Sequence, residues 1–147
     1  MSNSVRGMIA GLIATLVLSA IMLVKRSMGL WPELSLIQLL VNLGSITPVQ
    51  AWMDHFIIGV VVWGLIYGAL DAMLPEFAYW LKGIIVAVGA WLLMMVAFMP
   101  LAKVGFFGSN IGPIAAFVAL GYHIVYGVVL GLSYGLLTAW APAKTEA

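Results

Sequence analysis

The sequence predicts an all-α membrane protein, a bundle of four transmembrane helices built from two like-oriented helical hairpins. Three observations predict it. Of the 147 residues, 65% are hydrophobic and only 7% are charged, and the mean hydropathy is +1.17. A soluble domain devotes about a quarter of its residues to charge, so this chain lacks the residues for a water-exposed surface. In addition, four segments are long enough to span a bilayer, and part of the chain repeats.

Each predicted helix has about the 20 mainly apolar residues that cross a hydrocarbon layer about 30 Å thick. Lys25 and Arg26 follow the first helix, Pro48 suits the first position of the second, Pro100 is expected to end the third, and Pro113 to begin the fourth. The predicted helices are 5–24, 48–70, 83–99 and 113–140, in a single domain 1–147.

The connections are predicted to lie at the membrane boundary. Residues 31–43 form a partly amphipathic interfacial segment, and 105–113 is a glycine-rich turn before the last helix. Residues 141–147 form a short polar tail. The first apolar stretch exceeds the 7–15 residues typical of a signal-peptide core, and the repeat needs it as the first helix of a pair, so we expect it to be retained.

The repeat is clearest around the two histidines of the chain. "HFIIGVVVWGLIYG" at 55–68 resembles "HIVYGVVLGLSYG" at 123–135, and Arg6-Gly7 with its apolar run resembles Lys82-Gly83 with the run that follows it. A duplicated helix pair returns to its starting side, so both copies share one orientation. His55 and His123 are therefore expected to enter from the same side, each about 10–15 Å into its helix at 1.5 Å per residue.

Small residues recur at a spacing of four, which in membranes indicates close helix–helix contact. The alternative is that glycine clears space beside each histidine for a flat ligand, with Gly59 and Gly127 one turn beyond His55 and His123. The predicted packing residues are Gly7, Gly11, Gly127, Gly131 and Gly135.

A histidine inside a transmembrane helix requires a partner or a purpose. The structural interpretation is a neutral ring hydrogen-bonded across the bundle to a hydroxyl or to a backbone carbonyl. The candidate hydroxyls are those of Ser19, Tyr67, Tyr126, Ser133 and Tyr134. The functional alternative is one b-type haem held between His55 and His123, because imidazole is a common axial ligand of haem iron.

Two further interpretations have weaker support. Cu(I) bound by histidine and thioether is conceivable near Met94, Met95 and Met99, although methionine also fills gaps in apolar cores. Proton or ion transfer lacks a carboxylate at the middle of any predicted helix; Asp54 is expected to reach the headgroups or Lys25 and Arg26. No dedicated metal site is expected.

No enzyme motif is present, and we expect no catalytic residues. Paired carboxylates, HExxH, Gly-x-Ser-x-Gly and a phosphate-binding loop are all missing from the sequence. The chain has no cysteine, which excludes disulfides and thiolate metal ligands. A net charge of +1 gives no reason to expect nucleic acid.

Three stretches together resemble one known family. "GMIAGLIATLVLSAIMLVKRSMGLWPEL", "AWMDHFIIGVVVWGLIYG" and "KGIIVAVGAWLLMMVAFMPLAKVGFFG" are similar to a family of small bacterial membrane proteins known only as a domain of unknown function. The resemblance covers nearly the whole chain. It implies four transmembrane helices and a bacterial origin, and it implies no activity.

The predicted function is that of a non-enzymatic accessory or assembly subunit, which packs through its glycine faces against other membrane proteins or itself. The alternative is bis-histidine haem binding in electron transfer. The predicted location is the bacterial cytoplasmic membrane. Orientation is not predicted, because Arg6, Lys82 and Lys144 on one side balance Lys25, Arg26 and Lys103 on the other.

Overall fold

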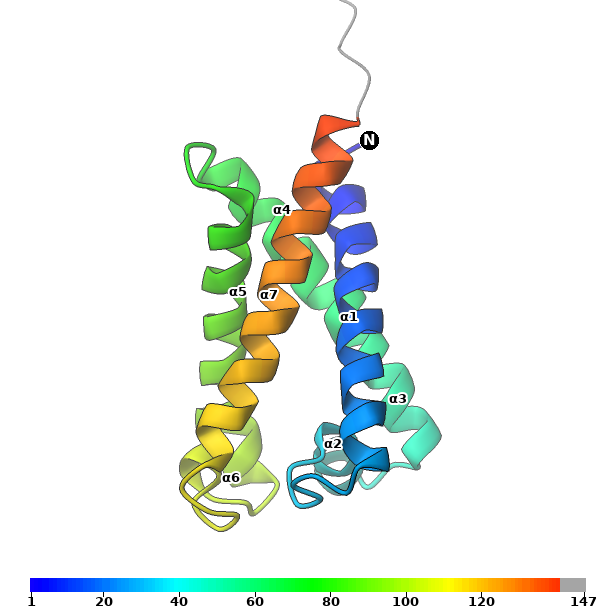
Figure 1. The fold of residues 1–147 in the computed structure, drawn as a ribbon, viewed down its shortest axis with the longest axis vertical. Coiled ribbons are helices and arrows are strands. Elements are labelled where there is room, and N and C mark those ends of the chain that lie inside the picture. The colour runs from blue at the N-terminus through cyan, green and yellow to red at the C-terminus, as the bar shows by residue number, and fades with distance from the viewer. Residues whose placement is uncertain (141–147) are drawn as a thin grey trace, which may run out of the picture.

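The computed structural model describes residues 1–140, which form long helices and no strand (Figure 1). The predicted polar tail and Lys144 lie outside the described residues. Four segments are long and apolar enough to cross a membrane: Asn3–Ser27, Pro48–Met73, Tyr79–Leu101 and Ala115–Ala139. The all-α class is confirmed with its four predicted helices in order, each boundary shifted by no more than a few residues.

The first and last long helices are regular, whereas the middle two are each interrupted by a π-helical stretch. The elements are α1 (Asn3–Ser27), α2 (Leu36–Gly44), α3 (Pro48–Phe56), η1 (Ile57–Val62), α4 (Trp63–Met73), α5 (Tyr79–Leu93), η2 (Met94–Phe98), α6 (Met99–Leu101), η3 (Phe106–Gly108) and α7 (Ala115–Ala139). Of these, α2 is the ordered part of the predicted interfacial segment.

Local sequence explains where the helices begin and end. The Thr47 hydroxyl accepts from the Gln50 amide, and the Gln50 side chain accepts from the Thr47 amide, so a capping box starts α3 at Pro48 as predicted. The last helix begins at Ala115, two residues after the predicted Pro113. The loop before it includes residues with positive φ from Gly105 (φ 81°) to Gly112 (φ 144°), and a helix cannot start until this loop ends. The third helix passes Pro100 and ends at Leu101.

The π-helical stretch η1 keeps the glycines of the second long helix on one face. Gly59 and Gly64 are five residues apart, one more than the spacing of four in α7. A π turn holds one extra residue, since its hydrogen bonds join residues i and i+5. Gly59, Gly64 and Gly68 consequently all face α1, where an added Cβ would meet Thr15, Gly7 and Asn3 respectively.

Two close helix pairs form the centre of the protein. In the first, α1 lies against η1 and α4: a Cβ on Gly11 would lie 2.8 Å from the Gly59 carbonyl oxygen. In the second, α5 lies against α7: a Cβ on Gly127 would lie 2.6 Å from the Ala87 Cβ. Contact between α1 and α7 joins the pairs, and Figure 1 shows α4 crossing behind them toward the start of α5.

The two pairs correspond with a register that differs from the predicted one. Gly11 faces Gly59, and Gly83 faces Gly127, so Gly11 occupies the place in the first pair that Gly83 occupies in the second. The sequence comparison had aligned Gly7 with Gly83, one helical turn away. Apolar runs match at several offsets, and only the contacts distinguish them. The duplication itself stays a prediction.

A polar cluster joins α4, α5 and α7 at the end of the protein where α1 begins and α7 ends. Lys82 donates to Asp71 at 2.5 Å, and both side chains are nearly enclosed, with 1% and 14% of their surface exposed. The Tyr67 hydroxyl donates to the Tyr79 carbonyl at 2.8 Å, and the Tyr67 and Tyr134 rings lie 4.8 Å apart. Lys82 was expected just before the start of a helix, and its ion pair with Asp71 was not predicted.

Candidate ligand-binding site

A cavity of about 470 Å³ lies at the opposite end, where α2 enters between the helix pairs. Its volume falls in the range of small-molecule sites, roughly 300–1,000 Å³. The apolar part of its wall comes from the long helices and α2, and includes Leu18, Met22, Leu39, Met94 and Met99. The polar part includes Trp52, Tyr122, His123, Gln38 and Glu33. An amphiphilic molecule would find both kinds of surface here.

His123 contributes the most informative polar group of this wall. Its Nδ1 lies 2.8 Å from the carbonyl oxygen of Ala119, one turn earlier in α7. A carbonyl oxygen only accepts, so Nδ1 must carry the proton, and a neutral ring then has a lone pair on Nε2. Within residues 1–140, Nε2 has no hydrogen-bond partner and is not sealed among other atoms. It is therefore a free acceptor in the cavity wall.

His55 is used differently, although it lies at a similar depth. It is the eighth residue of α3, and His123 is the ninth of α7. The His55 Nε2 lies 3.1 Å from the Ser19 hydroxyl of α1, and only 5% of the residue is exposed. Trp52 and Phe56 present their edges to its ring at centroid distances of 5.6 Å. The hydrogen bond that the structural interpretation expects is present, and Ser19 is the partner among its candidates.

The glycines beside the histidines are filled by neighbouring helices. Gly59 faces the Thr15 side chain, and Gly127 faces Gly83 and Ala87. Neither clears space for a flat ligand, and His55 is not among the residues that line the cavity. His123 lines the cavity and His55 is hydrogen-bonded to Ser19, so the structure does not bring both imidazoles to the wall of this cavity.

The predicted packing glycines all lie at close contacts within the chain. Gly7 and Gly11 face η1 and α4, Gly127 and Gly131 face α5, and Gly135 lies against the Tyr79 ring. In the structure, all five lie at contacts between helices of the same chain. These surfaces are consequently covered by the chain's own helices and not exposed to a partner.

The methionines of the third long helix pack in a buried cluster beside the cavity. Met94, Met95 and Met99 are buried with Leu39 of α2 and Ala119 of α7. Met94 and Met99 reach the cavity wall, and Met95 does not. Among residues 1–140 there is no group of three His, Asp or Glu side chains that would hold a metal ion. In this arrangement the thioethers supply flexible apolar surface.

Lys25 fixes the loop that covers the cavity. Its ammonium group donates to the Trp31 carbonyl at 2.8 Å and to the Leu34 carbonyl. Only 9% of Lys25 is exposed. Asp54 makes no ion pair within the described residues, and the expected partner Lys25 is thus engaged with backbone. The sequence indicated Lys25 as the end of a helix and as a possible partner of Asp54, and it did not indicate these two backbone contacts.

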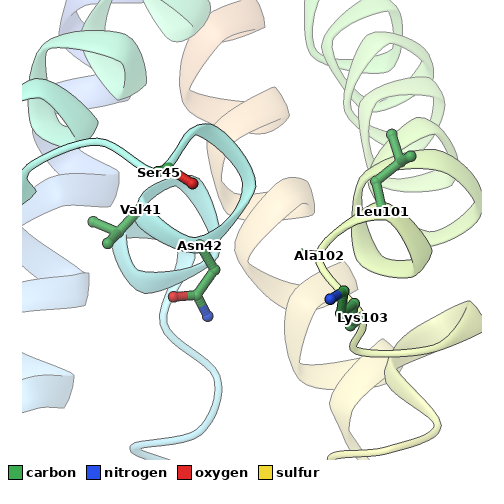
Figure 2. Close-up of a pocket in the computed structure, with 6 residues that line it drawn as sticks. All are labelled: Val41, Asn42, Ser45, Leu101, Ala102 and Lys103. Atoms are coloured by element: carbon green, nitrogen blue, oxygen red, sulfur yellow. The ribbon is translucent and has the colours of Figure 1, made fainter.

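A second hollow of about 470 Å³ lies on the other side of α2 (Figure 2). Figure 2 shows one wall formed by Val41 and Asn42 of α2 with Ser45 directly after it, and the other formed by the end of α6 and the turn that follows. Val41 and Asn42 line both spaces. α2 therefore borders open space in both hollows.

Comparison with known proteins identifies the chain by family alone. No curated protein and no solved structure matches it. A family model matches residues 1–145, nearly the whole chain, and so confirms the resemblance to an uncharacterised domain family. On the basis of this match over residues 1–145, the chain belongs to the Family of unknown function (DUF6789).

Proposed function

We propose that this is a non-enzymatic accessory protein of the bacterial cytoplasmic membrane that binds a lipid-soluble amphiphile. The observation that carries the proposal is the cavity of about 470 Å³, with a largely apolar wall and a free imidazole nitrogen. A concave, mostly apolar space with a smaller number of polar groups is the usual form of a small-molecule site.

The position of the cavity indicates how its occupant would enter. The cavity lies at the end of the long helices, where the apolar residues of the spans meet the polar residues of α2 and its preceding loop. A molecule dissolved in the bilayer has its polar head at this level and its apolar body below. The open spaces beside α2 give such a molecule a route that does not separate the two glycine-packed pairs.

Open positions on the outer faces of α5 and α7 support the accessory role. The predicted packing glycines are used inside the chain, whereas Gly89 and Gly121 are exposed and have no atom within 4 Å of an added Cβ. Small exposed residues let another transmembrane helix approach closely. A partner subunit, or a second copy of this chain, would meet these outer faces of α5 and α7.

Recovery of a bound molecule tests the proposal. We expect protein purified in mild detergent to release one lipid-soluble compound on solvent extraction, detected by mass spectrometry. Met22→Trp fills the cavity wall and should remove most of this compound. Met53→Trp is the matched control, because Met53 is 59% exposed and does not line the cavity. Equal amounts in all three proteins, or none in the wild type, would overturn the proposal.

Haem binding by His55 and His123 is the second candidate. One observation favours it: a histidine that donates Nδ1–H to a backbone carbonyl is arranged like the metal-ligating histidines of proteins. His55 would have to exchange Ser19 for iron. Protein from haem-replete cells should then show a Soret band that is absent from His55→Ala and His123→Ala, and a colourless folded protein would exclude it.

A further inference from the structure

We propose that the occupant of this cavity carries a hydroxyl group that donates a hydrogen bond to Nε2 of His123. The inference rests on the proposed function and specifies the chemical class of its ligand: a long-chain alcohol, a phenol or a similar hydroxyl-bearing amphiphile. Four observations support it in turn, beginning with the proton on the His123 ring.

The Ala119 carbonyl fixes that proton. The distance of 2.8 Å to Nδ1 is that of a good hydrogen bond, and the acceptor is a backbone atom of the same helix. Because α7 is regular from Ala115 to Ala139, this acceptor cannot move away without breaking the helix. Rotation of the ring by 180° would lose the bond, so Nε2 is the ring nitrogen left without a partner in a residue that lines the cavity.

The surroundings favour the neutral ring, which has a lone pair on Nε2. A charged imidazolium in an apolar environment requires a carboxylate partner. Within residues 1–140, no Asp or Glu oxygen lies within 4 Å of His123, and the one such ion pair joins Lys82 to Asp71 at the opposite end. Nε2 therefore accepts a hydrogen bond and does not donate one.

No donor in the described chain satisfies this acceptor. The side chains that line the cavity with His123 are largely apolar, as with Leu18, Met22 and Met94. A polar atom at an apolar wall gains most from a partner that brings its own apolar body, because the partner also fills the space. The complementary group is a donor on an otherwise apolar molecule.

Trp52 favours a hydroxyl among the possible donors. It lines the same cavity as His123, and its indole N–H makes no hydrogen bond within residues 1–140. The wall carries further polar side chains, among them Tyr122 and Gln38. A hydroxyl both donates and accepts, so one group can meet Nε2 of His123 and an acceptor-seeking donor of the wall such as Trp52. An ether or ester oxygen can only accept, and would leave Nε2 unpaired.

A matched pair of probes tests this. We would compare 1-tetradecanol with its methyl ether in protein purified in mild detergent, measuring binding by the shift in unfolding temperature with concentration. We expect the alcohol to bind wild-type protein about ten-fold more tightly than the ether, the effect of one good hydrogen bond. His123→Phe should keep the ether affinity and lose that ten-fold advantage.

A second measurement uses the unaltered protein, in case His123→Phe does not fold. In protein with ¹⁵N-labelled histidine, Nε2 of His123 should give the signal of an unprotonated nitrogen that moves on adding the alcohol and stays on adding the ether. Ser19→Ala identifies the His55 signals, because Ser19 contacts only that ring. A protonated Nε2, or equal movement with both probes, would overturn the inference.

The possible failures are distinguishable. If alcohol and ether bind wild-type protein equally and Met22→Trp abolishes both, the cavity binds amphiphiles and the hydroxyl specificity is wrong. If neither probe binds, and extraction also recovers no compound, the proposed function itself fails. Binding that Met53→Trp reduces as much as Met22→Trp would place the probes outside the cavity and would overturn both.

Discussion

At the scale of single residues, the two histidines show that equal depth does not give equal roles. Both lie about two turns into their helices. The His55 ring crosses to Ser19 of the neighbouring helix, whereas the His123 ring bonds to its own helix and borders the cavity. The difference lies in what each ring meets: α1 offers a hydroxyl opposite His55, and no described donor meets Nε2 of His123.

Removing the Ser19 hydroxyl should destabilise the protein. Ser19→Ala leaves a buried imidazole nitrogen without its partner, and we expect a loss of about 0.5–2 kcal/mol, the range for hydrogen bonds in membrane proteins. Unfolding in a denaturing detergent measures it. Ser133→Ala is the control: Ser133 is also buried, but its hydroxyl makes no hydrogen bond within residues 1–140. Equal losses in both would mean that the Ser19–His55 bond adds nothing.

Glycine substitutions should separate packed from exposed positions. Gly127→Leu drives a side chain into Gly83 and Ala87, and we expect it to cost about 1–3 kcal/mol. Gly121→Leu lies on the same helix with no atom within 4 Å of its Cβ, and should change stability little. The same unfolding assay compares them. If Gly127→Leu were as stable as the wild type, the α5–α7 contact would be misplaced.

At the scale of elements, the π-helical stretch η1 is what lets the second long helix pack like the fourth. In α7 the glycines follow one another at four residues, and an ordinary α-helix presents them on one face. The second long helix has one extra residue, and η1 takes it up between Gly59 and Gly64. Without the π turn, Gly64 and Gly68 would rotate away from α1.

Deleting one residue should be tolerated inside η1 and not inside α7. Without Val62, whose side chain is 42% exposed, the glycines of the second helix acquire the spacing of four and can pack in a plain α-helix. Without Leu132, which is 53% exposed, Tyr134 and Gly135 rotate by about 100° out of the core. Folding yield in detergent and unfolding temperature compare the two.

The outcome is informative in either direction. A folded protein lacking Val62, beside a misfolded one lacking Leu132, supports η1 as an absorbed insertion. If deletion of Val62 were the more damaging, the extra residue would have a packing role of its own. No such glycine contact fixes the rotation of α2. Lys25 bonds to the loop before it, and Leu39 is its buried residue beside open space.

At the scale of the whole molecule, the two ends differ. At the end where α1 begins and α7 ends, ionic and aromatic contacts join α4, α5 and α7 around Lys82 and Tyr134. At the other end, α2 and its loop lie between the helix pairs, and the cavity remains. Stability is thus concentrated at one end and open space at the other, an arrangement that lets a ligand enter without disturbing the packed half.

The ion pair offers a test of this division. Asp71→Asn leaves Lys82, 1% exposed, without a counter-charge, and we expect a loss of about 3–5 kcal/mol. The double variant Asp71→Leu with Lys82→Met should regain most of it, because an apolar pair of similar size needs no compensation. Denaturant unfolding of the three proteins checks this. A single variant as stable as the wild type would show that Lys82 reaches water or headgroups.

The sequence alone determined the all-α class, the four spans and the residues that bring helices together. Hydrophobicity and helix length are local properties, and a chain with 7% charged residues has few alternatives to membrane-spanning helices. Small residues such as Gly11 and Gly127 indicate close contact wherever they occur. Ser19, the hydroxyl partner of His55, was also among the candidates that the sequence offered.

Only the tertiary structure decided which surfaces meet. Helix rotation determines four features of this structure. They are the extra residue taken up in η1, the one-turn register of the helix pairs, the Lys82–Asp71 ion pair and the cavity beside α2. A rotation of 100° per residue changes which side chain faces inward, while the apolar composition stays the same. For that reason the sequence named His55 and His123 together, and the packing separated them into a buried contact and a free acceptor.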